Sequence, residues 1–200
     1  MKTLYLGTDP SHYAGEGEVV HYPVIRIVPR SAEDPEVRDA FSAPYTHLIL
    51  TSKQAAKIYF ALEQHRPKVV FAIGAVTAAT IQSYGCKVDY IPEEATQEGL
   101  IALLERLDLQ DPSFFLPRSS LARPLLTDYL LQRGWRTRIL DLYETVPQKR
   151  EPVPDLSHFQ RIVFTSPSTV RAFIEIFGAL PGDKELVSIG PITQNYLDNR

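Results

Sequence analysis

One pattern in this chain occurs twice, in the same order and at nearly the same spacing. The run His47–Ser52 (HLILTS) returns as Arg161–Ser166 (RIVFTS), an offset of 114 residues from position 47 to position 161. The run Ala72–Thr77 (AIGAVT) returns as Ser188–Thr193 (SIGPIT), an offset of 116 residues from position 72 to position 188. Two ordered matches at nearly one offset indicate two related halves, and they predict two similar domains.

Short apolar runs alternate with amphipathic runs along most of the chain. Residues 53–65, 97–107 and 121–133 have apolar side chains at the spacing of one buried helix face. Strands that alternate with helices predict parallel sheets with right-handed crossovers, and therefore an α/β protein. The expected strands are 3–6, 24–28, 47–51, 69–73, 87–91, 114–116, 137–142, 161–165 and 186–189.

Proline residues mark two extended segments of the chain. Pro23 and Pro29 bracket the extended run 24–28, and three further prolines follow the run 142–146. Proline and the residue before it favour extended backbone over helix, so we interpret both segments as crossings between domains. The expected division is a discontinuous first domain over 1–22 and 149–200, a second domain over 30–140, and interdomain linkers over 23–29 and 141–148.

Charge and composition narrow the functional classes. The formal net charge is −3 at pH 7, which argues against a protein that coats nucleic acid or an anionic membrane. The single cysteine, Cys86, excludes an internal disulfide framework and a cysteine-rich zinc site. The apolar stretch before Asp9 is too short for a signal peptide. The uncharged run 69–86 is interpreted as a strand, a turn and a helix rather than as a membrane span. We therefore expect a cytoplasmic protein with no nucleic-acid or membrane partner.

The repeated turns have two interpretations. As helix starts, Thr51 is an expected N-cap with Gln54 three residues later, and Ser166 and Gly190 each precede a proline. As a binding site, these turns follow parallel strands, at the sheet edge where α/β proteins bind ligands. Helix N-terminal amides at that edge favour carboxylates or phosphates. Two such turns in each domain predict a cleft lined with amides and hydroxyls for an anionic ligand.

Known catalytic and cofactor motifs are missing from the sequence, so we expect neither a cofactor nor a metal. There is no phosphate-binding loop and no nucleophile elbow, and the five histidines show no metal-ligand spacing. Arg118 follows a predicted strand and is either an anion clamp or a solvated arginine at a helix start. Tyr143 lies at the predicted return to the first domain. It is either a packing residue or a hydrogen-bond or proton donor that faces the cleft.

From about residue 45 to the last residue, the sequence carries a series of short motifs in a fixed order. Each motif alone has low specificity, whereas the ordered set is specific. The motifs are Ile49–Ser52, Ala72–Thr77, Gly85–Pro92 with Glu98–Leu100, Leu116–Arg118 with Ala122–Arg123, Leu142–Pro147, Val163–Ser168 and Ser188–Thr193.

This set resembles the uroporphyrinogen-III synthase family. The resemblance implies two flavodoxin-like, parallel-sheet α/β domains joined by a two-stranded linker. It also implies a cofactor-free lyase that acts on hydroxymethylbilane, a linear tetrapyrrole with eight carboxylates. In the family, loss of the terminal hydroxyl gives a cationic azafulvene, which the substituted carbon of ring D attacks. The resulting spiro intermediate reopens and closes with ring D inverted, giving uroporphyrinogen III, a precursor of haem.

The same resemblance implies the site residues. Tyr143 matches the family tyrosine that assists departure of the hydroxyl, so it is the expected catalytic residue. Nothing in the sequence demands more than a monomer, so we expect a monomer, and a transient hand-over of the substrate from hydroxymethylbilane synthase is an open expectation. The expected substrate-binding residues are Thr51, Ser52, Gly74, Thr77, Arg118, Thr165, Ser166, Ser168, Gly190 and Thr193.

The sequence departs from the family pattern in its first domain. Residues 7–17 are too short and too rich in helix breakers for the helix that the family has there. The second half also has no counterpart of the segments 87–91 and 96–100. We therefore expect the first domain to be reduced. The alternative function is a non-catalytic two-domain α/β module that binds an anionic metabolite. A periplasmic-type solute-binding protein is disfavoured because no signal peptide is visible.

Overall fold

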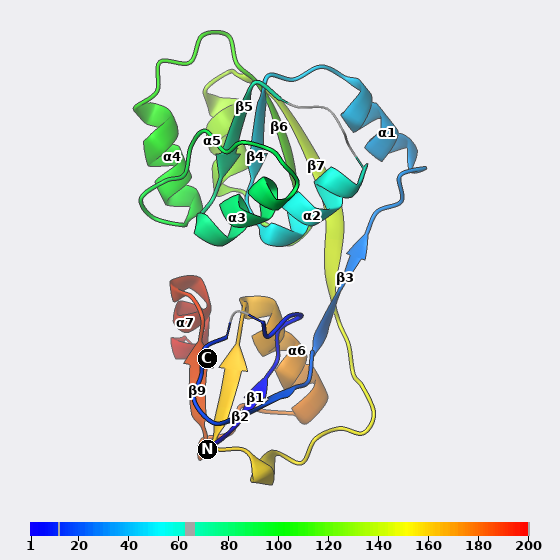
Figure 1. Ribbon diagram of the computed structural model, residues 1–200, viewed down its shortest axis with the longest axis vertical. Helices are drawn as coiled ribbons and strands as arrows, with labels where there is room; N and C mark the ends of the chain where they lie inside the picture. Colours follow the sequence, from blue (N-terminus) through cyan, green and yellow to red (C-terminus); the bar gives the residue numbers. More distant parts are fainter. Residues whose placement is uncertain (12, 63–66, 200) are drawn as a thin grey trace. The chain divides into compact units, whose positions relative to one another are not determined.

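The computed structural model describes residues 1–11, 13–62 and 67–199. The chain divides into two compact units. Unit 1 comprises Met1–Val28 and Thr145–Arg200, and unit 2 comprises Pro29–Glu144. Strands β3 (Ile25–Pro29) and β7 (Arg136–Pro147) each pass from one unit into the other, and they are neighbours in one sheet (Figure 1). Both units are α/β structures built on parallel strands, as predicted.

Unit 1 is built on a four-stranded parallel sheet with the strand order β2-β1-β8-β9. Between β1 and β2, the described residues form no helix, in agreement with the reduced first domain that the sequence predicts. The strands are β1 (Lys2–Tyr5), β2 (Glu18–His21), β8 (Arg161–Phe164) and β9 (Glu185–Ser188), and the helices are α6 (Pro167–Phe177), α7 (Pro191–Asp198) and the 3₁₀ turn Leu156–His158.

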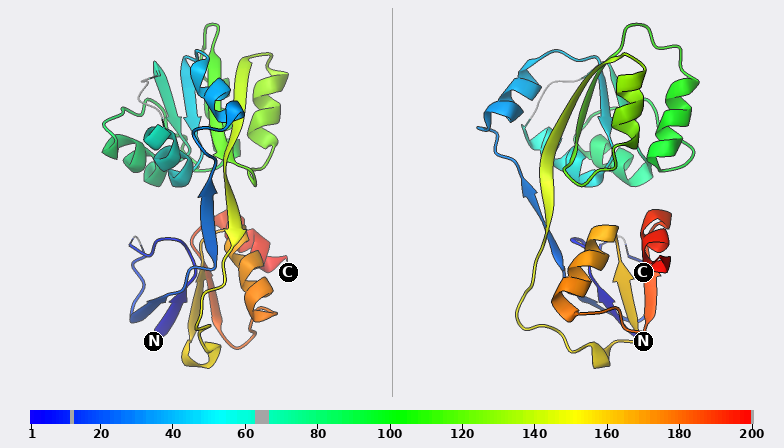
Figure 2. Two further views of the ribbon diagram at one scale, coloured as in Figure 1. Left: turned by 90° about the vertical axis from the view of Figure 1, so that its right-hand side faces the viewer. Right: turned by 180° about the vertical axis from the view of Figure 1, so that it is seen from behind.

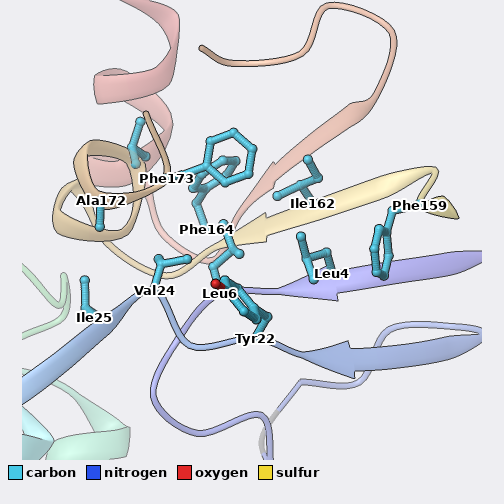
Figure 3. Close-up of a cluster of buried hydrophobic side chains, with 11 residues drawn as sticks. Leu4, Leu6, Tyr22, Val24, Ile25, Phe159, Ile162, Phe164, Ala172 and Phe173 are labelled. Carbon is cyan, nitrogen blue, oxygen red and sulfur yellow. The ribbon is translucent and has the colours of Figure 1, made fainter. Parts of the chain in front are cut away.

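The core of unit 1 lies between its sheet and α6. Alternate residues of β1 and β8 point to the same face, because the side-chain period of a strand is two. Leu4 and Phe164 therefore meet Phe173 of α6 in one fully buried cluster (Figure 3). The rings of Phe164 and Phe173 pack edge to face with centroids 5.4 Å apart, an arrangement that aromatic pairs favour.

Unit 2 contains a five-stranded sheet with the order β3-β7-β6-β4-β5, in which the pairs β7/β6, β6/β4 and β4/β5 are parallel. Helices cover both of its faces (Figure 2). The remaining strands are β4 (His47–Leu50), β5 (Val69–Ala72) and β6 (Ser113–Ser119), and the helices are α1 (Pro35–Ser42), α2 (Lys53–Leu62), α3 (Ala75–Ser83), α4 (Gln97–Glu105) and α5 (Leu125–Gln132).

The side chains of successive residues in β6 point to opposite faces of the sheet, and each face of the sheet has its own buried core. Leu116 packs with Leu104 of α4 and Leu130 of α5 in one buried cluster. Phe115 points to the other face, where its ring contacts Phe41 at a centroid distance of 5.2 Å. Strands that are buried on both faces appear in sequence as continuous apolar runs, which explains why the run 114–116 was recognisable.

Several predicted boundaries differ from the observed ones. The predicted helix 121–133 begins only at Leu125, because Pro124 occupies its N-cap. The predicted strand 87–91 is wrong, since this segment contributes only one isolated bridge, between Tyr90 and Phe71. The strand predicted over 137–142 extends over Arg136–Pro147. Residues 63–65 of the predicted helix 53–65 lie outside the described residues.

Besides the 3₁₀ turn Leu156–His158, one strand and one helix were not predicted. Strand β2 is mostly exposed and polar at both ends, so it lacks the apolar signature of a buried strand. Helix α1 begins with the N-cap Asp34, whose side chain accepts a hydrogen bond from the Glu36 amide, and with a proline in its first turn. Among the described helices, none is long and apolar enough to cross a membrane.

Candidate functional site

Tyr143 is a buried tyrosine whose hydroxyl contacts another hydroxyl side chain. It lies in β7 of unit 2 and is 5% exposed. Its hydroxyl oxygen is 2.9 Å from Ser52 Oγ, although the two residues are 91 positions apart in sequence. Burial raises the pKa of Tyr143 above its ordinary value, and hydrogen bonds to Ser52 and Ser119 act in the opposite direction. The phenol therefore stays protonated at neutral pH, while both of its hydroxyl neighbours favour the phenolate.

Ser52 is fixed by the helix that follows it. The Ala55 amide donates a hydrogen bond of 2.9 Å to Ser52 Oγ, and the Ala56 amide donates to the Ser52 carbonyl. This is the pattern of an N-cap, so the prediction that Thr51 caps this helix is wrong by one residue. With Ser52 as the cap, Gln54 falls at the second helical position, where it cannot complete a capping box.

Arg118 is held by an acidic neighbour on the adjacent strand. It lies in β6, its Nε donates to Asp141 Oδ1 at 2.9 Å, and its side chain is 17% exposed. A terminal nitrogen of its guanidinium also lies 3.4 Å from Thr127 Oγ1. The interpretation of Arg118 as a solvated arginine at a helix start is therefore wrong. The carboxylate of Asp141 balances the positive charge of Arg118.

The glycine turns of the repeat begin α3 and α7 without a side-chain cap. Gly74 and Gly190 are the N-caps of these helices, and neither has a side chain that can accept a hydrogen bond. Gly190 precedes a proline at the first helical position, as predicted. Thr77 and Thr193, in the first turns, are each only 4% exposed. Neither helix start therefore has a side-chain cap, and both threonines of the first turns are buried.

In the turn Thr165-Ser166 of unit 1, the hydrogen bonds involve Thr169, a residue that was not identified from the sequence. Ser166 caps α6 as predicted, and its Oγ accepts from the Thr169 amide at 3.3 Å. Thr169 Oγ1 in turn accepts from the Ser166 and Thr165 amides at 3.2 and 3.1 Å. This is a capping box, and the signal was a hydroxyl residue three positions after the N-cap. Ser168, one position earlier, accepts from the Arg171 guanidinium at 3.3 Å.

A bidentate ion pair and a buried amide join the starts of α4 and α5. Arg123 donates to both carboxylate oxygens of Glu98 at 2.7 Å, and this lowers the pKa of Glu98 to about 2. Gln97 Oε1 accepts from the Leu126 amide at 3.0 Å, and Gln97 Nε2 donates to the Arg123 carbonyl at 3.2 Å. Gln97 therefore supplies the cap that Pro124 cannot provide for α5.

Metal-ligating side chains do not gather in the described part of the chain. Among residues 1–11, 13–62 and 67–199, no group of three or more His, Cys, Asp or Glu residues is placed to hold a metal ion. His12 and His65, two of the five histidines considered from the sequence, lie outside the described residues.

The family model for uroporphyrinogen-III synthase HemD matches residues 13–200 of this chain. A relative from Methanothermobacter thermautotrophicus is 30% identical over 173 residues, which cover 76% of this chain and 68% of the relative. A uroporphyrinogen-III synthase of Chlorobaculum parvum is 26% identical over 160 residues, which cover 76% of this chain and 63% of that relative. The fold is similar to that of a mutant uroporphyrinogen III synthase from Thermus thermophilus, with a TM-score of 0.67 and 19% identity over 99% of this chain and 88% of that chain. The chain therefore belongs to the uroporphyrinogen-III synthase family.

Proposed function

We propose that the chain is a uroporphyrinogen-III synthase, a lyase of tetrapyrrole (haem) biosynthesis. It converts hydroxymethylbilane to uroporphyrinogen III and inverts ring D through a spiro intermediate. Beside the family membership, the observation that carries the proposal is the buried hydroxyl of Tyr143, which Ser52 holds at 2.9 Å. The non-catalytic module considered from the sequence is not favoured, because the family is one of cyclising enzymes.

Tyr143 is the proposed proton donor to the departing hydroxyl. The C–O bond of the terminal hydroxymethyl group breaks, the phenol proton joins the hydroxyl, and water leaves. Overall, cyclisation replaces one C–O and one C–H bond by a C–C bond. The ring carbon that loses its hydrogen at closure therefore returns a proton to the phenolate. Because burial raises the pKa of Tyr143, the donor is present in its protonated form at neutral pH.

The open helix starts are the proposed binding places for the substrate carboxylates. An N-terminus without a side-chain cap leaves amide donors free, and the helix dipole favours negative charge there. The helix starts at Gly74 and Gly190 both lack a side-chain cap. At Gly190, Pro191 has no N–H and the Thr193 amide donates to the Gly190 carbonyl, so the Ile192 amide is the proposed donor in that turn. The buried hydroxyls of Thr77 and Thr193 would fix the first turns rather than reach the substrate. The remaining substrate-binding residues in the proposal are the partly buried Thr51, Ser52, Arg118, Thr165, Ser166 and Ser168.

The domain division is part of the same proposal. The chain passes between the two compact units after Val28 and after Glu144, and these points fall within the linkers 23–29 and 141–148 expected from the sequence. The substrate carries its own reactive hydroxymethyl group, so the proposed chemistry uses orientation and proton transfer and requires no cofactor. We propose that the protein acts as a cytoplasmic monomer that can receive its substrate directly from hydroxymethylbilane synthase.

A coupled assay tests the proposal. Hydroxymethylbilane is generated in place by its synthase, and the oxidised products are separated into isomers I and III. Without a catalyst the substrate closes to isomer I. We expect isomer III in excess of a blank without protein, and a loss of that excess in Tyr143→Phe.

Tyr129→Phe is the matched control for this assay. It makes the same change in unit 2, at a buried hydroxyl that has no hydrogen-bond partner among the described residues, so it should retain activity. Isomer I alone from the folded wild-type chain would refute the proposed function. Full activity and isomer selectivity in Tyr143→Phe would refute the role of Tyr143.

A further inference from the structure

We propose that Asp141 is a positioning residue for substrate binding and that it acts through Arg118. Asp141 holds the guanidinium at Nε, and the terminal nitrogen Nη2 of Arg118 then binds one carboxylate of the substrate. This inference rests on the proposed function, because it specifies how one residue of the proposed carboxylate-binding set is oriented. Sequence reasoning did not single out Asp141.

Asp141 and Arg118 are paired at the carboxyl end of β6. Arg118 is the next-to-last residue of that strand, and it lies opposite Asp141 in the register of β6 against β7. Asp141 is two positions before Tyr143, the proposed proton donor, in the same strand. The carboxyl ends of parallel strands form the edge at which α/β sheets bind ligands. Both residues of the pair are therefore at the edge that the proposed site uses.

The guanidinium of Arg118 is held at two of its three nitrogens. Nε donates to Asp141 Oδ1 at 2.9 Å, and Nη1 makes a longer contact of 3.4 Å with Thr127 Oγ1. The Thr127 hydroxyl hydrogen is already engaged, because it donates to the Pro124 carbonyl at 2.6 Å. The Thr127 oxygen is thus left to accept from Arg118. Because a guanidinium is planar and rigid, contacts at two nitrogens fix the direction of the third.

The third nitrogen, Nη2, is accessible to a ligand. Within the part of the chain that the structure describes, Arg118 hydrogen-bonds through its side chain to Asp141 and Thr127 only, and neither bond uses Nη2. Among the described residues, the side-chain atoms that are enclosed and without a partner belong to Thr3 and Tyr129, so Nη2 is not enclosed. Its two hydrogens can reach an acceptor that arrives from solvent, and carboxylates match the guanidinium in charge and geometry.

Asp141 affects an anionic ligand in two opposite ways. Its side chain is 45% exposed, so its negative charge repels a carboxylate that approaches this edge. Its hydrogen bond to Nε orders the Arg118 side chain before the ligand arrives, and this lowers the entropy cost of binding. The ordering effect requires Arg118, whereas the repulsion does not. The two effects can therefore be separated by removing Arg118.

The test is a double-mutant cycle between Asp141 and Arg118. The Kd for uroporphyrin III, the oxidised product with eight carboxylates, is measured by quenching of protein fluorescence, and KM and kcat are measured for isomer III formation. We expect Asp141→Ala to raise Kd and KM about three- to tenfold, the factor expected for one net hydrogen bond, and to leave kcat nearly unchanged. In the Arg118→Gln background, Asp141→Ala should leave Kd unchanged or lower it, because only the repulsion is removed.

Two further variants serve as rescue and control, and urea unfolding checks that each variant is folded. Asp141→Asn keeps an oxygen that can accept from Nε and should restore most of the affinity. Asp111→Asn removes the carboxylate that pairs with Arg136, next to the amino end of the β6/β7 pair, and should change neither Kd nor KM. Asparagine tolerates the positive φ of 44° at Asp111.

The binding and kinetic measurements separate the ways in which the inference can fail. An unchanged Kd in Asp141→Ala refutes the positioning role, and so does an effect on kcat alone. Equal losses of affinity with and without Arg118 would show a merely structural effect and would also overturn it, as would failure of Asp141→Asn to restore binding. Absence of isomer III from a wild-type chain whose Kd values follow the cycle refutes the proposed function alone. A wild-type chain that neither binds uroporphyrin III nor forms isomer III overturns both.

Discussion

Replacing Gly99 by alanine tests whether close packing at the start of α4 outweighs helix propensity. Alanine is favoured over glycine in a helix interior by about 1 kcal/mol, so propensity alone predicts a more stable protein. In this structure, a Cβ added at Gly99 would lie 2.2 Å from the carbonyl oxygen of Glu94. Because the obstacle is backbone, the turn before the helix has to move. Such overpacking costs typically about 1–3 kcal/mol.

A second contribution comes from the cap of the same helix. Thr96 Oγ1 accepts from the Gly99 amide at 3.0 Å, and displacing the turn stretches this bond, which is worth about 1 kcal/mol. Overpacking and cap loss together exceed the propensity gain, so we expect Gly99→Ala to lower the free energy of unfolding by about 2 kcal/mol. For a chain of this size, that is a fall of about 4–8 °C in Tm.

Urea unfolding followed by circular dichroism measures the change, with Gly182→Ala as the control. Gly182 is exposed, and a Cβ there meets nothing within 4 Å, so alanine should be neutral or raise stability by about 0.5 kcal/mol. The reasoning would be refuted by a Gly99→Ala protein that is as stable as the wild type or more stable. The crystal structure of the variant would then show how the Glu94 carbonyl is accommodated.

Three further predictions concern stability. Ser166→Ala removes the N-cap of α6 and should cost about 1 kcal/mol in thermal unfolding. Gln97→Ala leaves the Leu126 amide without its acceptor and should cost about 2 kcal/mol in urea unfolding; an unchanged midpoint would contradict the capping role of Gln97. The pKa of Glu98 is lowered to about 2 by Arg123, so its contribution is fully present above the ordinary value of 4.5 and is lost as pH falls toward about 2. Because the pair is half exposed, we expect only about 0.3–1 kcal/mol. This is measured as the difference in acid sensitivity between wild type and Glu98→Gln, and equal sensitivity would refute it.

Local chemistry explains what the sequence could predict. Ser166 and Gly190, each followed by proline, begin helices as expected, because caps depend on neighbouring residues only. The strand at 161–165 was found because every residue of Ile162–Phe164 is buried and apolar. Strand β2 was missed because an exposed edge strand carries no such pattern. The Thr51 cap was misplaced because both residues of a Thr-Ser pair are good N-caps, and only the backbone decides between them.

Contacts between distant residues explain what the sequence could not predict. Tyr143 was singled out by its place at the predicted domain junction, and its catalytic role was assigned from its family motif. Its contact with Ser52 spans 91 positions, and no local pattern encodes that distance. The pairing of β6 with β7 passes over Leu142 of β7, so that Ser119 pairs with Tyr143. This irregularity depends on both strands together, so a sequence that predicts each strand correctly does not show it.

The two copies of the Thr-Ser turn have diverged at the third residue of the helix that follows. In unit 1 this residue is Thr169, whose hydroxyl accepts from the Thr165 and Ser166 amides, so the turn is closed by its own side chain. In unit 2 it is Ala55, which has no acceptor, and the cap Ser52 contacts Tyr143 instead. Amides engaged in a capping box cannot also bind a carboxylate. Because the Thr165 and Ser166 amides already donate to Thr169, the carboxylate binding that we propose for these two residues has to use their side-chain hydroxyls, whereas the proposed proton donor, Tyr143, lies in unit 2.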